Sequence, residues 1–280
     1  MNKAGLRTLG FAVAIAGTSP GVQAHEPWNY GPRQTYVQAG LEQYDWKEFS
    51  STDSILDKES GPLLTFGAGV SNFRRIDSGP IYQAGGQVYL GTLHYDGQTQ
   101  SGIPLTTKSD YSGLQLEGLG GYRFARWPHG IDLFGGGGWE YWSRSIQDAL
   151  AANGTPAYGY IEQYYVLYAK LGAGFFQEFG SWSYRIKAGG KYPLYTYEHA
   201  NLGDGLSLSP GRELSGFARI TVEFGPSTQD HFGLILDYDS FRFGQSNAQL
   251  LTVAGTPVGL FVQPQSHRNV YAIRGVYYFR

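Results

Sequence analysis

Two pairs of residues in this 280-residue sequence have the types and the spacing for acid–base chemistry. His94 and Asp96 stand two positions apart, and so do Asp237 and Asp239. In an extended strand, side chains two positions apart point to the same face. A histidine that faces carboxylates can activate a water molecule for hydrolysis. The spacing therefore gives one hypothesis, a hydrolase with His94, Asp96, Asp237 and Asp239 as its candidate catalytic residues.

Other kinds of site lack their motifs in this sequence. The 6 histidines are scattered without HExxH spacing, so no metal site is predicted. The absence of cysteine excludes thiolate chemistry. The glycine run 135–138 leads into Trp139-Glu140-Tyr141-Trp142, which continues a strand, whereas a phosphate-binding loop opens a helix. We expect no cofactor, and a net charge of −2 gives no reason to expect a nucleic-acid partner.

The elements that must position these residues are β-strands. The chain contains 41 glycines and 22 tyrosines, and aromatic residues make up 16% of it, a composition that suits twisted and curved strands. Alternation of apolar with polar residues, as in Leu114-Gln115-Leu116-Glu117, has the period of two that strands show. It predicts ten strands, at residues 34–46, 61–74, 80–96, 110–125, 130–146, 158–178, 181–197, 212–225, 231–245 and 267–280.

The connections between these segments alternate in length. The odd-numbered ones are long and polar, at residues 47–60, 97–109, 147–157, 198–211 and 246–266. The even-numbered ones are tight and rich in Gly, Pro, Asp and Ser, at residues 75–79, 126–129, around 180 and 225–230. Transmembrane barrels have short turns on one side and longer loops on the other. A soluble β-sandwich is the alternative, but nothing obliges its connections to alternate. We therefore predict an all-β, closed, antiparallel, up-and-down transmembrane barrel of ten strands, with eight or twelve as alternatives.

Outward-facing aromatic residues provide a second indication of a barrel. They gather beside the short connections, where one ring at a membrane interface would place them. The residues concerned are Tyr122, Phe124, Phe179, Trp182, Phe224, Phe232, Tyr277 and Phe279.

The last strand resembles the C-terminal assembly signal of bacterial outer-membrane β-barrel proteins. Its alternate residues are apolar or small and end on an aromatic: Tyr271, Ile273, Gly275, Tyr277 and Phe279. The sequence departs from that class at Arg280, because the class usually ends on the aromatic itself, and this puts the efficiency of recognition in question. The resemblance implies contact with the barrel-assembly machinery through residues 269–280, and with outer-membrane lipid and lipopolysaccharide. It implies no activity.

The first 24 residues have the pattern of a secretory signal peptide. Lys3 and Arg7 precede a short apolar run at residues 9–16, and Val22-Gln23-Ala24 supplies the small residues that a signal peptidase requires. We expect cleavage before His25, one barrel domain at residues 25–280, and location in the outer membrane of a Gram-negative envelope. No apolar stretch of 18 or more residues occurs, so no transmembrane helix is predicted.

The inward-facing positions carry charges of both signs. They are Glu42, Glu117, Arg123, Asp132, Glu140, Arg144, Glu162, Lys170, Arg185, Lys187, Lys191, Glu213, Arg219, Glu223, Asp237 and Arg274. Since a ten-stranded barrel is narrow, these charges are expected to pair and to plug the lumen. A porin-like passage for small solutes is the alternative, although the mixed signs argue against strong ion selectivity.

The two pairs with acid–base spacing would stand on opposite walls of such a barrel. In this respect the sequence is similar to the omptin proteases, ten-stranded barrels with acidic and His–Asp pairs on opposite outer walls. That similarity implies hydrolysis at the rim, of peptide, lipid or lipopolysaccharide. However, His94 falls on the outward parity unless a bulge reverses it, and no omptin motif surrounds it. We predict a non-enzymatic outer-membrane barrel with a structural, binding or small-solute role, and a rim hydrolase as the alternative.

Overall fold

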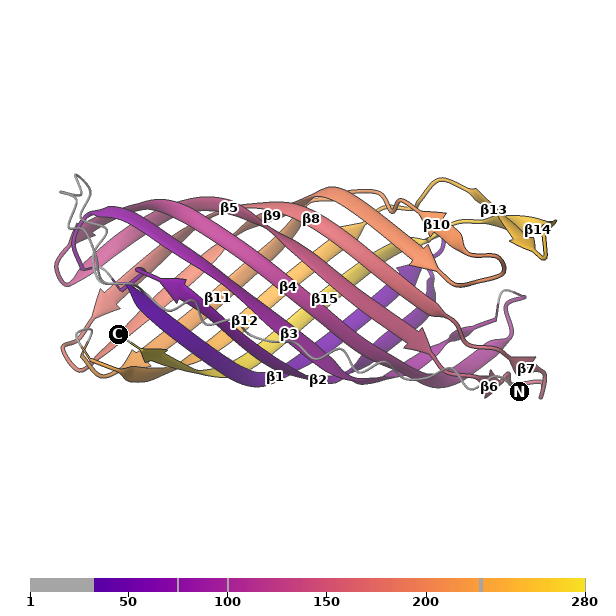
Figure 1. Cartoon of the computed structure of the whole chain (residues 1–280), viewed down its shortest axis with the longest axis horizontal. Helices are drawn as coiled ribbons and strands as arrows, with labels where there is room; N and C mark the ends of the chain where they lie inside the picture. The colour runs from indigo at the N-terminus through magenta and orange to yellow at the C-terminus, as the bar shows by residue number, and fades with distance from the viewer. Residues whose placement is uncertain (1–32, 75, 100, 227–228, 280) are drawn as a thin grey trace, which may run out of the picture.

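The computed structural model describes residues 33–279, except 75, 100 and 227–228. The expected signal peptide, residues 1–24, lies outside the described residues. Every regular element in the described part is a β-strand (Figure 1). None of its segments forms a helix long and apolar enough to cross a membrane.

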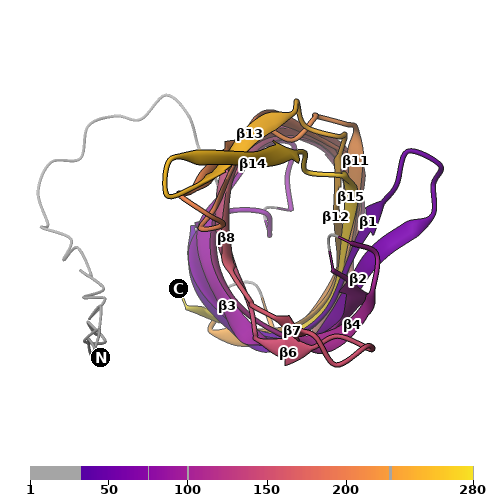
Figure 2. The ribbon, with the colours of Figure 1, turned by 90° about the vertical axis from the view of Figure 1, so that its right-hand side faces the viewer.

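Ten long strands form the wall of a closed barrel (Figures 1 and 2). They are β1 (Gln34–Phe49), β2 (Ile55–Ser71), β3 (Gly79–Gln98), β4 (Pro104–Arg126), β5 (His129–Ile146), β8 (Ile161–Glu178), β9 (Trp182–Ala200), β11 (Ser215–Phe224), β12 (His231–Phe243) and β15 (Gln265–Phe279). Each pairs antiparallel with its neighbours along the chain, and β15 pairs with β1 to close the circle, with Ile273 opposite Leu41. The predicted ten-stranded, antiparallel, up-and-down barrel is therefore confirmed.

Five shorter strands lie at the end of the barrel opposite the turns that join β2 to β3, β4 to β5, β8 to β9 and β11 to β12, and we call this end the outer end (Figure 1). β6 (Ala149–Leu150) pairs with β7 (Pro156–Ala157), and β13 (Gln249–Val253) pairs with β14 (Thr256–Phe261). β10 (Leu206–Leu208) adds to the end of β9. These pairings give structure to segments that the sequence pattern assigned to loops.

The predicted long loops at residues 47–60 and 97–109 are wrong. β1 and β2 continue to Phe49 and Ile55, and β3 and β4 continue to Gln98 and Pro104, so only tight turns separate them. The outward side chains of these extensions are polar, for example Lys47 and Lys58. A strand whose outward side chains are polar therefore looks like a loop in the sequence, although its backbone hydrogen bonds continue unbroken.

The outer wall carries an apolar band between two aromatic girdles. The eight aromatic residues predicted near the tight turns are all exposed, which confirms the first girdle. The second girdle lies farther toward the outer end and consists of Trp139, Tyr141, Tyr165, Tyr192, Tyr195, Tyr238 and Tyr271. Exposed leucine, isoleucine and valine side chains fill the band between them, among them Val37, Leu41, Leu64, Val88, Leu116, Leu133, Leu171, Ile186, Ile220, Leu234 and Ile273. Such a band is the surface that lipid covers in barrels of this kind.

The strands are longer than the apolar band requires. A tilted strand crosses a bilayer in about 9–11 residues. β3 has 20 residues and β4 has 23. Beyond the second girdle their outward side chains are polar, for example Thr92, His94 and Asp110. The wall therefore extends past the band at the outer end.

Candidate functional site: the charged lumen

Side chains that point into the barrel form three groups at three levels. The inner cluster lies beside the tight turns, the middle network lies halfway along, and the outer acidic cluster lies where β1, β5 and β9 end. The three groups differ in their balance of charge.

The inner cluster is built around a turn that enters the lumen. The connection from β2 to β3 carries Phe73 and Arg74, whose side chains are buried. Arg74 donates to the carbonyl of Gly225 at 2.6 Å, and its Nε lies 3.3 Å from Glu223. Arg185 donates to the carbonyl of Phe73 at 2.6 Å. A short turn is thus fastened to the opposite wall of the barrel.

The inner cluster as a whole has a net positive charge. Arg123 and Asp132 form a fully buried two-point pair at 2.6 and 2.7 Å, the strongest geometry for this type of contact. Lys187 Nζ stands 3.3 Å from the centre of the Phe73 ring and donates to Gln83, and it forms no ion pair within the described chain. The cations Arg74, Arg123, Arg185 and Lys187 outnumber the carboxylates Asp132, Glu178 and Glu223, so the formal charge is 4 − 3 = +1 with His231 neutral.

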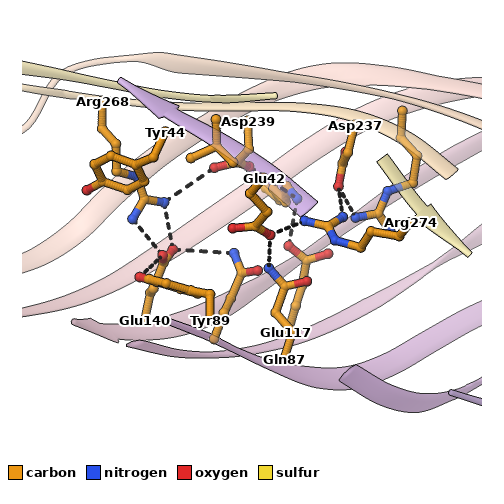
Figure 3. A pocket seen from close by; sticks show the side chains of 14 residues that line it. Glu42, Tyr44, Gln87, Tyr89, Glu117, Glu140, Asp237, Asp239, Arg268 and Arg274 are labelled. Atoms are coloured by element: carbon orange, nitrogen blue, oxygen red, sulfur yellow. Dashed lines mark hydrogen bonds and ion pairs between the residues drawn. The ribbon is translucent and has the colours of Figure 1, made fainter. Parts of the chain in front are cut away.

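The middle network balances its charges (Figure 3). Arg268 makes two bonds to Glu140, at 2.6 and 2.9 Å. Asp237 accepts from Arg219 at 2.5 Å and from Arg274 at 2.8 Å. The further ion pairs are Arg274 with Glu42, Lys170 with Glu117, and Lys191 with Asp239. Five carboxylates thus meet five cations.

Little space remains among these side chains. The cavity bounded by the middle network has a volume of about 30 Å³, and a second one toward the inner cluster has about 20 Å³. A single water molecule requires about 10–15 Å³ measured in this way. These cavities therefore fit one or two water molecules each.

An aromatic layer crosses the lumen between the middle network and the outer acidic cluster. Its members come from β1, β5, β8 and β12 and are almost completely buried: Tyr44, Trp46, Trp142, Tyr164, Tyr168, Phe241 and Phe243. Trp142 and Tyr164 stack with ring centres 4.7 Å apart, and the Arg268 guanidinium lies 4.9 Å from the Trp142 ring. Aromatic faces and a cation attract each other in such contacts.

The outer acidic cluster has one cation for five carboxylates. Arg144 contacts four of them, at 2.8 Å for the nearest pairs and 3.3 Å for the most distant: Glu48, Asp57, Glu59 and Glu162. The fifth is Glu198, which is fully buried and forms no ion pair with a cation of the described residues. The hydroxyl of Tyr164, opposite Glu198 in the strand register, points to Glu162 at 3.2 Å. The formal charge of the cluster is 1 − 5 = −4.

The structure does not bring the four candidate catalytic residues together. His94 and Asp96 are exposed on the outside of β3, opposite Lys108 and Thr106 of β4. Asp237 and Asp239 point into the lumen, where both are held by cations. The β3–β4 register is regular, so no bulge turns His94 inward. The two pairs lie on opposite sides of the barrel wall, and the idea that they face each other is wrong.

The inward charges predicted from strand parity point into the lumen and divide among the three groups, with the exception of Glu213. Glu213 lies before β11, where its backbone forms an isolated β-bridge with that of Arg242. Several of their partners were not predicted. Arg74 sits in a turn, and Glu48, Asp57, Glu59 and Glu198 sit in segments assigned to loops. The period-two pattern around Lys47 and Lys58 continues through three of these residues, and it is the signal that would have found them.

No family model matches the sequence, and no curated protein matches it either.

Among solved structures, the outer membrane protease OmpT from Escherichia coli has a TM-score of 0.55 at 8% identity, covering 88% of this chain and 96% of that one. An autotransporter translocator domain, NalP from Neisseria meningitidis, gives 0.35 at 12% identity, covering 88% of both chains. An outer membrane channel from Pseudomonas putida F1 gives 0.33 at 9% identity, covering 92% and 100%. Of these three, only OmpT has a TM-score above 0.5, and that likeness shows that the chain has the fold of an outer-membrane β-barrel protein.

Proposed function

We propose that this protein is a non-enzymatic outer-membrane barrel whose lumen is filled by its own side chains. Its role is then a binding or structural one, performed by the part of the barrel that extends beyond the membrane. The observation that carries the proposal is the continuous filling of the lumen, from Arg74 at the inner end to Arg144 at the outer end.

The aromatic layer is the main barrier to solute passage. Trp46, Trp142 and Phe241 have no exposed surface, and their rings span between strands on different sides of the barrel. Protein interiors packed in this way contain few voids larger than a water molecule. A hydrated ion or a small metabolite would have to displace several large side chains to pass.

Export, membrane insertion and lipid contact belong to the same proposal. The signal peptide at residues 1–24 would direct export, and the C-terminal strand would be read by the barrel-assembly machinery. In support of the latter, the outward side chains of β15 include exposed Tyr271, Ile273, Tyr277 and Phe279. The apolar band would then contact outer-membrane lipid, including lipopolysaccharide.

Conductance in planar bilayers tests the filled lumen. Folded protein, verified by a gel shift between unboiled and boiled samples, is expected to give no conductance steps. A Trp46→Ala/Trp142→Ala variant removes two rings of the aromatic layer and is expected to conduct. Trp182→Ala removes an outward ring of the same type and is expected to stay silent.

If the double variant does not fold, Phe241→Ala/Phe243→Ala removes two other rings of the layer. Conductance steps from the unaltered folded protein would overturn the proposal. Silence from every folded variant that lacks two rings would show that the aromatic layer is not the barrier.

A further inference from the structure

An apolar groove lies on the outer wall across β11, β12 and β15. These strands neighbour one another in the sheet (Figure 1). Its volume is about 450 Å³. The small side chain of Ala218 lies opposite Tyr238, between the larger side chains on both sides. The outward side chains that line it are Ala218, Ile220, Leu236, Tyr238, Tyr271 and Ile273. The groove thus lies at the level of the second aromatic girdle and just below it.

Three basic side chains stand in register beyond the outer end of this groove. Arg242 of β12 lies opposite His267 of β15, and His267 lies opposite Lys47 of β1. All three are partly exposed on the outer wall. They form one lateral row, which we call the cationic row.

A chain of hydrogen bonds joins the cationic row to the groove. Arg242 Nη2 donates to the side-chain oxygen of Asn269 at 2.9 Å. The same oxygen accepts from the hydroxyl of Tyr238 at 3.1 Å, and the Tyr238 ring is a wall of the groove. The positive charge of Arg242 is therefore held next to the groove, on the side toward the outer end.

The cationic row is under-neutralised. Arg242 forms no ion pair with a carboxylate of the described residues, and its bonds go to Asn269 and to the carbonyls of Phe241 and Arg268. Lys47 has Asp45 at 3.4 Å, in a pair that is partly exposed. In the middle network, by contrast, every cation meets a carboxylate. Arg242 therefore offers positive charge to a group outside the protein.

A second groove on the opposite wall provides a comparison. It has about 540 Å³, a floor that includes Gly118 and Gly137, and Trp139 among its lining residues. The outward residues beyond Trp139 on the same strand are Tyr141 and Ser143, which carry no charge. Two apolar grooves of similar size therefore differ in how near a cation stands. Arg242 is four positions from Tyr238 on β12, whereas Lys108 is eight positions from Leu116 on β4.

We propose that the groove across β11, β12 and β15 holds an acyl chain of a phosphorylated membrane lipid, with the phosphate on the cationic row. This inference rests on the proposed location in a membrane. The Arg242 guanidinium and the Lys47 ammonium donate charge-assisted hydrogen bonds to phosphate oxygens. Partial burial, together with Arg242 and Lys47, lowers the pKa of His267, so this residue adds a neutral imidazole N–H donor. An acyl chain that binds inside a membrane moves from lipid and not from water, so binding brings no hydrophobic gain. The favourable free energy comes instead from van der Waals packing of the chain in the groove. A ligand that uses both the apolar groove and the cationic row must carry an acyl chain and a phosphate.

Retention of lipid by the purified, folded barrel tests this assignment. Native mass spectrometry would compare protein supplied with phosphatidic acid and with diacylglycerol of the same acyl chains. We expect one phosphatidic acid to be retained and diacylglycerol to be retained at least tenfold less. Arg242→Gln/His267→Gln is expected to lower the retention of phosphatidic acid at least tenfold. Lys108→Gln, which removes an outward lysine on β4, is expected to leave it unchanged.

Ala218→Leu tests the groove separately, because it fills the space and leaves the cationic row intact. It is expected to reduce retention of phosphatidic acid by a similar factor. Equal retention of diacylglycerol would reduce the site to an apolar groove and overturn the proposal. So would unchanged retention by Arg242→Gln/His267→Gln, or full competition by inorganic phosphate. A gel shift between unboiled and boiled samples confirms folding of each variant. Because conductance is measured independently, failure here is distinguishable from failure of the proposed function.

Discussion

Glu198 is the least compensated charge in the described part of the lumen. Other buried carboxylates have a cation or several donors, as Glu140 has Arg268 and Tyr89. Glu198 is fully buried and forms no ion pair with a cation of the described residues. Among the same residues, the Tyr164 hydroxyl is its one side-chain donor and is shared with Glu162, while Glu162 and Glu48 contribute the largest repulsion. A buried polar atom without a partner costs about 1–3 kcal/mol, and more when it is charged. The residue therefore works against the stability of the barrel.

Glu198→Gln is expected to stabilise the protein. The substitution keeps the shape of the side chain and removes its charge, so the free energy of unfolding should rise by about 1–3 kcal/mol at neutral pH. The midpoint temperature of unfolding in detergent, followed by the change in gel migration, measures the effect. Glu59→Gln is the matched control, since Glu59 is equally buried but accepts from Arg144, Ser109 and Tyr111. It should lower the midpoint, and a fall of similar size in Glu198→Gln would contradict the prediction.

At the residue scale, strand parity predicted most of the charges that point inward, but it missed Arg268 and did not predict which charges pair. Arg268 and Glu140 are 128 residues apart in the chain, and Arg274 and Glu42 are 232 apart. Their contact depends on how far each strand is shifted against the next around the whole circle. Local alternation contains no information about that shift. Parity did separate the two candidate pairs, because it placed His94 on the outer face and Asp237 on the inner face, and the structure confirms both placements.

The β13–β14 hairpin at the outer end is bound by Asp204 through its backbone amide, which donates to the carbonyl of Thr252 at 2.9 Å, and through its carboxylate. Asp204, in the connection after β9, accepts hydrogen bonds from the backbone amides of Ala254 and Gly255, both at 2.9 Å. These amides form the turn of the hairpin, where both residues have positive φ. The bond to the Gly255 amide, followed by those to Thr252 and Ala254, holds the pKa of Asp204 below its usual value. The hairpin is therefore tied to the barrel through a charge.

Asp204→Ala is expected to loosen this hairpin without unfolding the barrel. Amide hydrogen exchange at residues 249–261 should become faster, while exchange in β9 and β12 stays unchanged. Asp148→Ala is the matched control, because Asp148 accepts from the amide of Gly159 at 2.7 Å in a different outer loop. It should affect residues 147–160 only. Faster exchange throughout the barrel in Asp204→Ala would contradict the local role.

The same contact predicts a dependence on pH. Since the folded pKa of Asp204 is lowered, its contribution is fully present above 3.8, the usual value, and is lost as the pH falls through the lower folded value. Protection of the hairpin amides, corrected for intrinsic exchange rates, should therefore decrease in acid. The decrease should be absent in Asp204→Ala, whose hairpin is already loose at neutral pH.

At the scale of elements, the ten long strands were predictable and the five short ones were not. Long strands show the period-two pattern over many residues, and their tight turns carry Gly, Pro and Asp. β6, β7 and β10 have two or three residues each, which is too short for any periodicity to appear. β13 and β14 pair through a register shift at Leu251, so their alternation is broken. Their formation depends on contacts such as that of Asp204, which join segments distant in sequence.

For the whole molecule, the positions of tryptophan side chains relative to the wall make the membrane placement testable. Trp182 and Trp139 belong to the two girdles and face outward. Trp46 and Trp142 belong to the aromatic layer and are fully buried in the lumen. Aromatic side chains in girdles sit at the level of the lipid headgroups. A barrel that spans the membrane as its apolar band suggests must therefore expose the first pair to lipid and shield the second.

Single-tryptophan variants in vesicles are expected to separate these positions by fluorescence quenching. Lipids brominated near the headgroup should quench Trp139 and Trp182 more than lipids brominated near the end of the acyl chain. Neither lipid should quench Trp46 or Trp142. Trp139 and Trp142 form a strict comparison, because they lie three residues apart on β5 and face opposite sides of the wall. Strong quenching of Trp142 would show that lipid reaches the lumen side, and stronger quenching of Trp139 by the deep lipid would move the second girdle away from the interface.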